Sequence, residues 1–180
     1  MPGVVTPEVD LFAVRQAVAG LLAFRGHEGC RTKPTGKVPS VRAEPDCIFC
    51  GIVAGEIPST TIAQSERAIA FMDINPVTPG HALVVPRAHA TDVFDVASDD
   101  LAASMHLARQ IAGRAKDRLG ADGVNLLNCS GEAAWQDVFH FHIHVIPRFK
   151  DQPGKDAIRL PWDSVPGNPD EIERIGDLLA

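Results

Sequence analysis

The chain has few cysteines, no excess of basic residues and no long apolar run. Only four cysteines occur in 180 residues, and the N-terminus lacks a basic start followed by an apolar stretch, so we expect neither a disulfide framework nor secretion. The formal net charge of -6 argues against nucleic acid as the main ligand, because backbone phosphates are bound by clustered Lys and Arg. No apolar run reaches the roughly 18 residues that cross a bilayer. We therefore expect no membrane segment and a cytoplasmic location.

The chain does have enough apolar residues for a core, and it has three alternating histidines. Hydrophobic residues make up 45% of the sequence, which is ample for one domain of ordinary size. Residues 140–148 read HFHIHVIPR, with strand-forming apolar residues between the histidines. In a β-strand the apolar side chains would enter the core, and the imidazoles would share the opposite face about 6.5–7 Å apart. This pattern predicts a site built on His140, His142 and His144.

A neutral imidazole can be a nucleophile, a general base or a metal ligand. The spacing fits a central nucleophile with two flanking helpers, and it also fits a strand-borne metal site with an open position for water. A nucleophilic His142 must attack through an unprotonated Nε2, so an acceptor must hold its Nδ1–H. We expect that acceptor to be a main-chain carbonyl near His140. The triplet alone does not separate the alternatives.

Besides the triplet, the motif-bearing segments are residues 47–53, 56–58, 70–76, 79–81 and 83–89. On these segments and the triplet the chain resembles the histidine triad (HIT) family, whose members carry a His-x-His-x-His run with apolar spacers. The resemblance covers residues 46–150 as a HIT domain, between an N-terminal extension and linker at 1–45 and a C-terminal tail with a short helix at 151–180.

The resemblance implies an α+β fold with an antiparallel sheet of about five strands and one long helix, paired into a two-fold homodimer. In the sequence, residues 61–71 and 82–86 read as strands. The long helix is expected to start with Ser98 as its N-cap and to end at Gly120. Shorter helices are predicted over residues 9–24 and after Asn168.

The resemblance also implies an activity. HIT proteins of the hydrolase branch cleave at the α-phosphorus of a nucleoside phosphoramidate or a related purine nucleotide conjugate, through a covalent nucleotidyl-histidine. The matching nucleophile here is His142, with His140, His144 and Gln136 as its catalytic neighbours. His144, Gln136 and the backbone N–H of Val138 match the phosphate contacts. The other matching nucleotide contacts are Phe49, Ile52, Asp73, Ile74 and Asn128.

A second site is expected around Cys47 and Cys50. A C-x-x-C pair alone is a weak zinc signal, but HIT proteins with this pair complete a tetrahedral zinc with the residues that match His89 and His140. Four protein ligands close the coordination shell, so such a zinc would stabilise the fold rather than catalyse. The alternative is a reduced, buried cysteine pair with His89 hydrogen-bonded nearby.

The chain departs from the family pattern on both sides of Gln136. Many members have Gly before this glutamine and Ser or Thr after it, whereas this chain has Trp135 and Asp137. An ionised carboxylate would repel a phosphate where a hydroxyl would donate to it. Asp137 either acts as a general acid, faces a cation, or is a solvated loop carboxylate that alters the leaving-group preference.

Other functions stay open at this point. A dinucleoside polyphosphate hydrolase would use the same residues, and a non-catalytic nucleotide-binding or zinc-stabilised partner protein would explain Asp137. A catalytic zinc held by two triad histidines would require metal-dependent turnover. His81 is interpreted as a structural hydrogen-bonder outside the site and His106 as a surface residue, and Trp162 is expected to approach the partner protomer's site.

Overall fold

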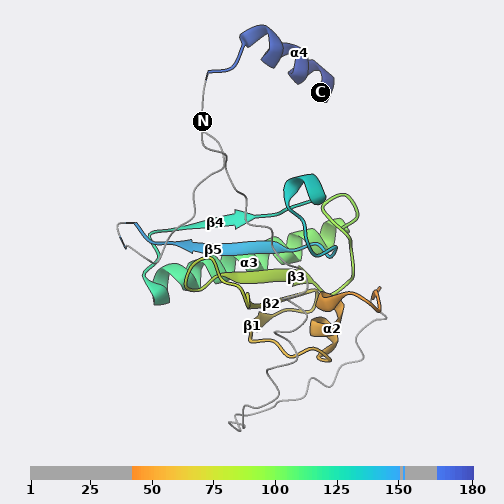
Figure 1. The fold of residues 1–180 in the computed structure, drawn as a ribbon, viewed down its shortest axis with the longest axis vertical. Coiled ribbons are helices and arrows are strands. Elements are labelled where there is room, and N and C mark those ends of the chain that lie inside the picture. Colours follow the sequence, from red (N-terminus) through yellow and green to blue (C-terminus); the bar gives the residue numbers. More distant parts are fainter. Residues whose placement is uncertain (1–41, 151, 153–165) are drawn as a thin grey trace, which may run out of the picture. The chain divides into compact units, whose positions relative to one another are not determined.

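A computed structural model describes residues 42–150, 152 and 166–180. The predicted helix over residues 9–24, most of the predicted linker and the prediction for Trp162 lie outside these residues. The described elements are shown in Figure 1, and their bounds are α2 (Ile48–Ala54), β1 (Thr61–Gln64), β2 (Ala68–Met72), β3 (Ala82–Pro86), α3 (Ser98–Leu119), β4 (Gly123–Leu127), the 3-10 helix η1 (Glu132–Ala134), β5 (Ile143–Arg148) and α4 (Pro169–Leu179).

The five strands form one antiparallel sheet in the order β1-β2-β3-β5-β4 (Figure 1). This confirms the predicted α+β fold with five strands and one long helix. The strand that carries the end of the histidine triplet is an interior strand, because β5 pairs with β3 on one side and with the edge strand β4 on the other. His144 lies opposite Leu83 and Leu127, so neighbouring strands fix its position on both sides.

The predicted strand over residues 61–71 is wrong as a single element. It consists of two strands, β1 and β2, which are joined by a turn at residues 65–67 and pair with each other. The Ser65 hydroxyl accepts a hydrogen bond from the backbone N–H of Ala68 at 3.0 Å, and the Ser65 N–H donates to the Ala68 carbonyl at 2.8 Å. A serine that bonds the backbone in this way favours a turn over a continuing strand.

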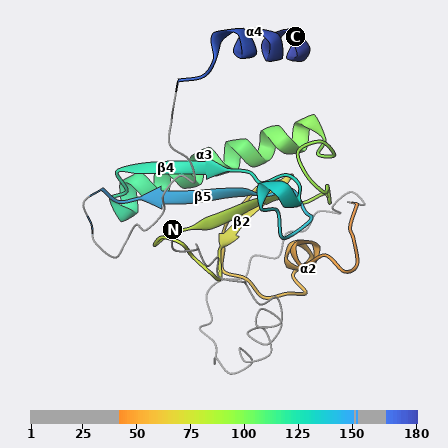
Figure 2. The ribbon, with the colours of Figure 1, turned by 45° about the horizontal axis from the view of Figure 1, so that its top comes forward.

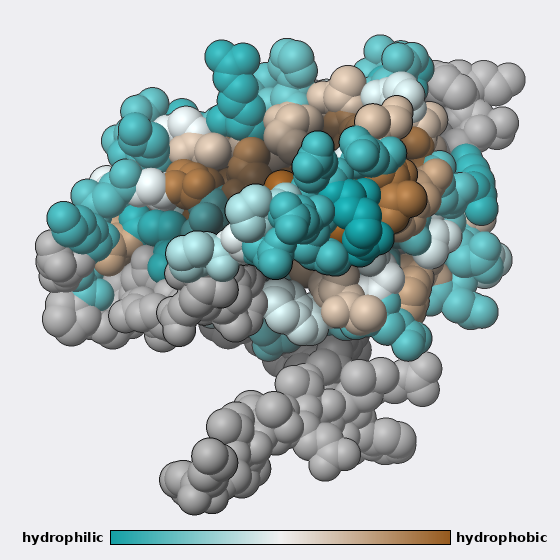
Figure 3. Space-filling model, turned by 90° about the horizontal axis from the view of Figure 1, so that it is seen from above, coloured by the Kyte–Doolittle hydropathy of each residue, from teal (hydrophilic) through white to brown (hydrophobic). Residues whose placement is uncertain are grey.

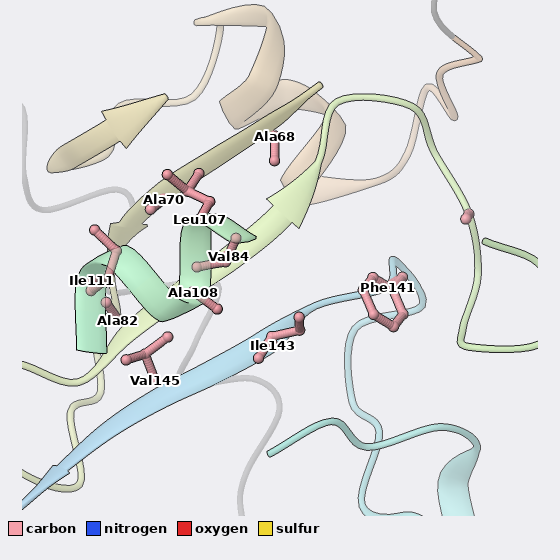
Figure 4. Packing of buried hydrophobic residues seen from close by; sticks show 11 residues of the cluster. Ala68, Ala70, Ala82, Val84, Leu107, Ala108, Ile111, Phe141, Ile143 and Val145 are labelled. Atoms are coloured by element: carbon pink, nitrogen blue, oxygen red, sulfur yellow. The ribbon is translucent and has the colours of Figure 1, made fainter. Parts of the chain in front are cut away.

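The two faces of the sheet have different partners. Helix α3 packs along one face (Figure 2), where small and β-branched strand residues let it approach closely, as Figure 4 shows. The opposite face carries Ile69, Phe71, Leu83 and Val85, which pack with Phe49 of α2. Because strand side chains alternate, Ile143 and Val145 point toward α3, and His144 belongs to the face away from that helix. The core against α3 consists of Ala68, Ala70, Ala82, Val84, Ala90, Leu107, Ala108, Ile111, Phe141, Ile143 and Val145.

The helix ends follow the sequence closely. Helix α3 has Ala97 as its N-cap and no side-chain cap, so the predicted Ser98 cap is wrong by one residue, and Ser98 opens the helix instead. Gly120 closes α3 with a φ of 66°, a left-handed conformation that glycine adopts without steric cost. The Asn168 side chain accepts from two backbone N–H groups at the start of α4, as an N-cap does.

Apolar side chains also remain at the surface. Figure 3 shows hydrophobic areas between hydrophilic side chains on one face. On the edge strand β4, Leu126 and Leu127 are each 41% exposed, and exposed apolar residues on an unpaired edge are typical of interfaces. The exposed leucines of β4 are consistent with the predicted homodimer, which stays a prediction. None of the helices in the described ranges has the length and apolar character to span a membrane.

Candidate functional site

The histidine triplet does not lie wholly on one strand, which corrects the sequence interpretation. β5 begins at Ile143, so His140 and His142 precede it and only His144 is a strand residue. The reason is a different backbone path, because the Phe141 N–H donates to the Ala90 carbonyl at 2.6 Å instead of joining the sheet ladder. The rings of His142 and His144 are nevertheless in contact, with centroids 4.9 Å apart.

His142 is held in the tautomer that a nucleophile needs. Its Nδ1 is 2.7 Å from the His140 carbonyl oxygen, and because a carbonyl can only accept, Nδ1 carries the proton and Nε2 keeps its lone pair. This confirms the expected main-chain acceptor. His142 is 1% exposed, and its ring forms a T-shaped contact with Phe49, with centroids 5.4 Å apart. The Asn128 amide donates to the His142 carbonyl at 2.8 Å and fixes the backbone at this point.

Cys47, Cys50, His89 and His140 converge as predicted. Cys47 Sγ is 3.4 Å from His140 Nδ1, Cys50 Sγ is 3.4 Å from His89 Nδ1, and Cys50 Sγ is 3.6 Å from His140 Nδ1. Tetrahedral zinc with bonds of about 2.3 Å to sulfur and about 2.0 Å to nitrogen places such ligand atoms about 3.5 Å apart. The four ligand atoms lie within 4.8 Å of one another. The cluster therefore fits a closed Cys₂His₂ zinc site.

The surroundings of His140 suit a metal ligand. Its Nε2–H donates to the Pro86 carbonyl at 3.1 Å, which leaves the Nδ1 lone pair directed at the thiols, as outer hydrogen bonds of zinc ligands do. Burial lowers the pKa of His140 to about 4, so the ring is neutral at pH 7. Burial also raises the pKa of the Cys50 thiol, a cost that a bound cation would offset.

Gln136 holds the loop that leads into the triplet. The side chain is buried, and its Oε1 accepts from the Gly131 N–H at 2.6 Å. Its Nε2 donates to the carbonyls of Thr91 and Val138 at 2.7 and 3.1 Å. Both amide hydrogens are thus used within the chain, and a direct contact of Gln136 with phosphate stays a prediction. Among the described residues, none accepts a hydrogen bond from the Val138 N–H, which leaves that group available to a phosphate oxygen.

The predicted nucleotide-contacting residues differ in their surroundings. Phe49 is buried between Phe71 and His142, Ile52 packs beside it, and Ile74 is 68% exposed. Asp73 forms the expected turn, because its Oδ1 accepts from the Asn75 N–H at 2.7 Å. The contacts of these residues with a nucleotide stay predictions.

His81 belongs to the site, contrary to the sequence interpretation. It is 3% exposed, its Nε2 is 3.0 Å from His144 Nδ1, and its Nδ1 is 3.4 Å from Asp73 Oδ2. This contact cannot be predicted from local sequence, because His81 and His144 are 63 residues apart in the chain. The register of β3 against β5, in which Leu83 pairs with His144, brings His81 to the triplet. His106 is exposed on α3, as predicted.

Trp135 has a backbone conformation that glycine adopts more easily than other residues. Its φ is 68°, the sole positive value at a non-glycine residue in the described chain. The left-handed region costs an L-residue about 1–2 kcal/mol, and the Trp135 side chain, 64% exposed, forms little packing to offset that cost. The chain therefore carries local strain next to Gln136.

We expect Trp135→Gly to raise the free energy of unfolding by about 0.5–1 kcal/mol, because relief of the strain exceeds the extra entropy of an unfolded glycine. Chemical denaturation monitored by circular dichroism measures the change. Trp135→Ala is the matched control, since it removes the same side chain but keeps the strained backbone. Equal stability of the two variants would show that φ is not the source of the strain.

Asp137 is exposed beside the site. Burial lowers the pKa of His144 to about 4, assisted by the charges of His142 and His81, and the carboxylates of Asp73 and Asp137 oppose that shift. Burial, with a contribution from Asp137, raises the pKa of the Cys129 thiol. Asp137 therefore places negative charge near His144, and its exposure fits the solvated-carboxylate interpretation.

The sequence matches a family model and is similar to several known proteins. The family model described as "HIT domain" matches residues 54–151. The chain is 38% identical over 138 residues to the "Protein hit" of Bacillus subtilis, covering 75% of this chain and 92% of that protein. It is 34% identical over 134 residues to an adenosine 5′-monophosphoramidase of Schizosaccharomyces pombe, covering 74% and 96%.

A solved structure shows the same fold. The Zn-bound histidine triad family protein of Mycobacterium smegmatis superposes with a TM-score of 0.59 and 38% identity, over 64% of this chain and 84% of that one. The residues that the family model matches, 54–151, contain all five strands, α3 and the triplet. With an α+β fold, a carbonyl-held central histidine and these relatives, the chain belongs to the histidine triad (HIT) family.

Proposed function

We propose that the protein is a nucleotide hydrolase that cleaves at the α-phosphorus of nucleoside phosphoramidates or related nucleotide conjugates through a nucleotidyl-His142 intermediate. The observation that carries the proposal is the 2.7 Å hydrogen bond from His142 Nδ1–H to the His140 carbonyl. It leaves the Nε2 lone pair of a buried, neutral-tautomer ring as the attacking group. The similarity to the monophosphoramidase of S. pombe supports the choice of leaving group.

The reaction would proceed in two displacements. His142 Nε2 attacks the α-phosphorus, a P–N bond to the histidine forms, and the bond to the leaving group breaks as that group takes up a proton. Water then attacks the nucleotidyl-histidine, which releases the nucleoside monophosphate and restores His142. Such transfers ask the protein mainly to position the phosphoryl group and to stabilise its oxygens. We assign that task to His144 and the Val138 N–H, with Gln136 holding the loop.

We further propose a nucleotide pocket beside the triplet. Phe49 and Ile52 would form the apolar wall for a purine base, with Ile74 at its exposed edge. Asp73 would accept hydrogen bonds from the ribose hydroxyls, since one carboxylate oxygen remains after the other has bonded Asn75 N–H. Asn128 would act through the backbone of His142, to which its amide already donates.

We also propose a structural zinc on Cys47, Cys50, His89 and His140. Its Lewis acidity would stabilise two thiolates in a buried place, and four protein ligands leave no position for a reactive water. A catalytic zinc that uses His140 is disfavoured, because this closed site would already occupy the Nδ1 of His140. Through the His140 carbonyl, the zinc site and the nucleophile share one residue. We also propose that the protein is a homodimer and that it is located in the cytoplasm.

Intact-protein mass spectrometry after brief mixing with adenosine 5′-phosphoramidate tests the proposed function. The expected result is a transient gain of one adenylyl group together with release of AMP. AMP release from diadenosine polyphosphates and not from the phosphoramidate would favour the dinucleoside polyphosphate hydrolase. A protein that binds AMP but forms no adduct and releases no product from either substrate would be a binding protein.

Replacement of Asp137 by Ser tests whether this carboxylate is a solvated loop residue that takes no part in catalysis. Because the carboxylate is exposed, we expect Asp137→Ser to lower the KM for adenosine 5′-phosphoramidate only severalfold, roughly the 0.5–1 kcal/mol of an exposed charge. Steady-state kinetics measures the effect, and Asp117→Ser, an exposed change on α3, is the control. A fall in kcat of more than about a hundredfold would instead identify Asp137 as the general acid.

A further inference from the structure

Hydrogen bonds close the 3-10 turn that precedes Gln136 and fix its backbone. The Gln136 Oε1 accepts from the Gly131 N–H at 2.6 Å, and the Gln136 backbone N–H donates to the Gly131 carbonyl at 3.2 Å. Between these two residues, the Trp135 N–H donates to the Glu132 carbonyl at 2.9 Å. The turn therefore holds Trp135 in its left-handed conformation, with φ 68° and ψ 24°.

The indole of Trp135 contributes little to the fold. It is 64% exposed, and among the residues that the structure describes no aromatic ring packs against it and no acceptor receives its Nε1–H. Strained conformations that the surroundings fix are concentrated at functional sites. An exposed indole on a rigid turn offers a large apolar face and one hydrogen-bond donor, which suits the binding of a ligand.

This turn lies beside the proposed reaction centre. The charge of Asp137 acts on the pKa of His144, so the end of the turn is close to the triplet. The Val138 N–H is the group that we assign to a phosphate oxygen. Trp135 precedes Val138 by three residues, so their Cα atoms are at most about 11 Å apart. An indole ring and a group bonded to the phosphorus can meet across that distance.

The leaving group is the part of the substrate that fits this place. The proposed wall for the base comes from α2, and the proposed ribose contact follows β2, whereas residues 131–136 have no assigned nucleoside contact. A substrate group that reaches Trp135 is therefore on the other side of the phosphorus. Further phosphates in that group would be repelled by the exposed carboxylate of Asp137. An amine of low negative charge fits better than a polyphosphate.

We propose that Trp135 determines specificity by stacking on an aromatic leaving group, so that the preferred substrates are nucleoside phosphoramidates of aromatic amines. The inference rests on the proposed function, because His142 must displace the amine. In that displacement the P–N bond to the amine breaks, the amine nitrogen keeps the electron pair and takes up one proton, and the nucleotide stays on His142 until water releases it. Ring stacking adds to the burial of apolar area, which favours aromatic over saturated groups.

Steady-state kinetics tests the proposal with adenosine 5′-phosphoramidate and its N-(2-phenylethyl) and N-(2-cyclohexylethyl) derivatives. The two derivatives have leaving groups of similar size, and only one of them is aromatic. We expect Trp135→Ala to lower kcat/KM about tenfold for the phenylethyl substrate, the scale of one stacked ring, and less for the cyclohexylethyl substrate. The unsubstituted phosphoramidate should be unaffected, because its leaving group does not reach the indole.

Further changes at the same position separate stacking from a structural role. Trp135→Phe retains an aromatic ring and should retain most of the preference for the phenylethyl substrate. Trp135→Leu retains only an apolar contact on the same strained backbone and should behave like Trp135→Ala. Trp135→Gly should be more stable than the wild type and still lose the preference, a combination that a structural role would not produce.

Three results would overturn the proposal. An equal loss for all three substrates in Trp135→Ala would place the indole against the nucleoside. Unchanged kinetics for all three would make Trp135 a surface residue without a part in substrate choice. A loss confined to diadenosine triphosphate would assign the indole to a second nucleobase instead of an amine.

Binding measurements distinguish failure of this inference from failure of the proposed function. Isothermal titration calorimetry compares adenosine 5′-(2-phenylethyl) phosphate with adenosine 5′-methyl phosphate, neither of which has an amine to release. The wild type should bind the phenylethyl diester about tenfold more tightly than the methyl diester, and Trp135→Ala should lose most of this difference. If no phosphoramidate gave AMP, the proposed function would fail, and this difference would still support an aromatic subsite at Trp135. Equal affinities of the wild type for the two diesters would overturn the inference even if phosphoramidates were hydrolysed.

Discussion

Replacing His142 by Asn is expected to lower turnover of adenosine 5′-phosphoramidate by about 10⁴-fold or more, the loss typical of removing a nucleophile. The structure gives the reason, since His142 has its Nδ1–H bound to the His140 carbonyl at 2.7 Å and its Nε2 lone pair left over. An asparagine amide can keep a hydrogen bond to that carbonyl but offers no nitrogen nucleophile. The covalent adduct should therefore disappear while AMP still binds.

The measurement combines intact-protein mass spectrometry with rapid mixing and AMP release over the same time course. His106→Asn makes the same chemical change on the exposed face of α3 and should behave as the wild type. An adduct that survives in His142→Asn would place the nucleophile on another residue, and acid stability would then separate a phosphohistidine from an ester. Turnover without any adduct in the wild type would favour direct attack by water.

The sequence predicts the parts of this fold that depend on short-range pattern. The helix over residues 98–119 follows from its apolar period and Gly120, and α4 follows from Asn168 and Pro169. The strand over residues 61–71 fails because Ser65 hydrogen-bonds the backbone at Ala68 and closes a hairpin. Ile62 and Ala63 precede this turn and Ala68 follows it, so the apolar pattern alone predicts one continuous strand.

The candidate site is also predictable from the sequence only where its residues lie close together in the chain or where the family resemblance links them. The cysteine pair and the triplet are visible in sequence because their members are close together, and the family resemblance links them to His89. The sequence does not indicate His81, because its place beside His144 depends on strand register, which no local pattern encodes. It also does not indicate that His140 and His142 precede β5, since this backbone path depends on the hydrogen bond from the Phe141 N–H to the Ala90 carbonyl.

Replacing Cys50 by Ser is expected to abolish zinc binding and to lower the free energy of unfolding by at least about 3 kcal/mol, because a metal that binds only the folded chain adds its binding energy to stability. The ligand atoms of Cys47 and His140, of Cys50 and His89, and of Cys50 and His140 are already 3.4, 3.4 and 3.6 Å apart, close to the spacing in a tetrahedral zinc site. The loss should exceed that of Cys129→Ser, a matched change at a buried cysteine outside the cluster. Elemental analysis should find one zinc per wild-type chain and per Cys129→Ser chain, and denaturation should give the stability difference.

The structural and catalytic alternatives for this zinc differ in what a chelator does. Under the structural proposal, chelation lowers the thermal midpoint, yet below the new midpoint the protein still forms the adenylyl adduct on His142. Under the catalytic alternative, adduct and AMP release stop as soon as the metal is removed, while the fold persists. Because the proposed zinc ligand His140 also supplies the carbonyl that holds His142, we expect partial chelation to slow adduct formation only in step with unfolding. Loss of activity at temperatures where circular dichroism shows an intact fold would contradict the structural assignment.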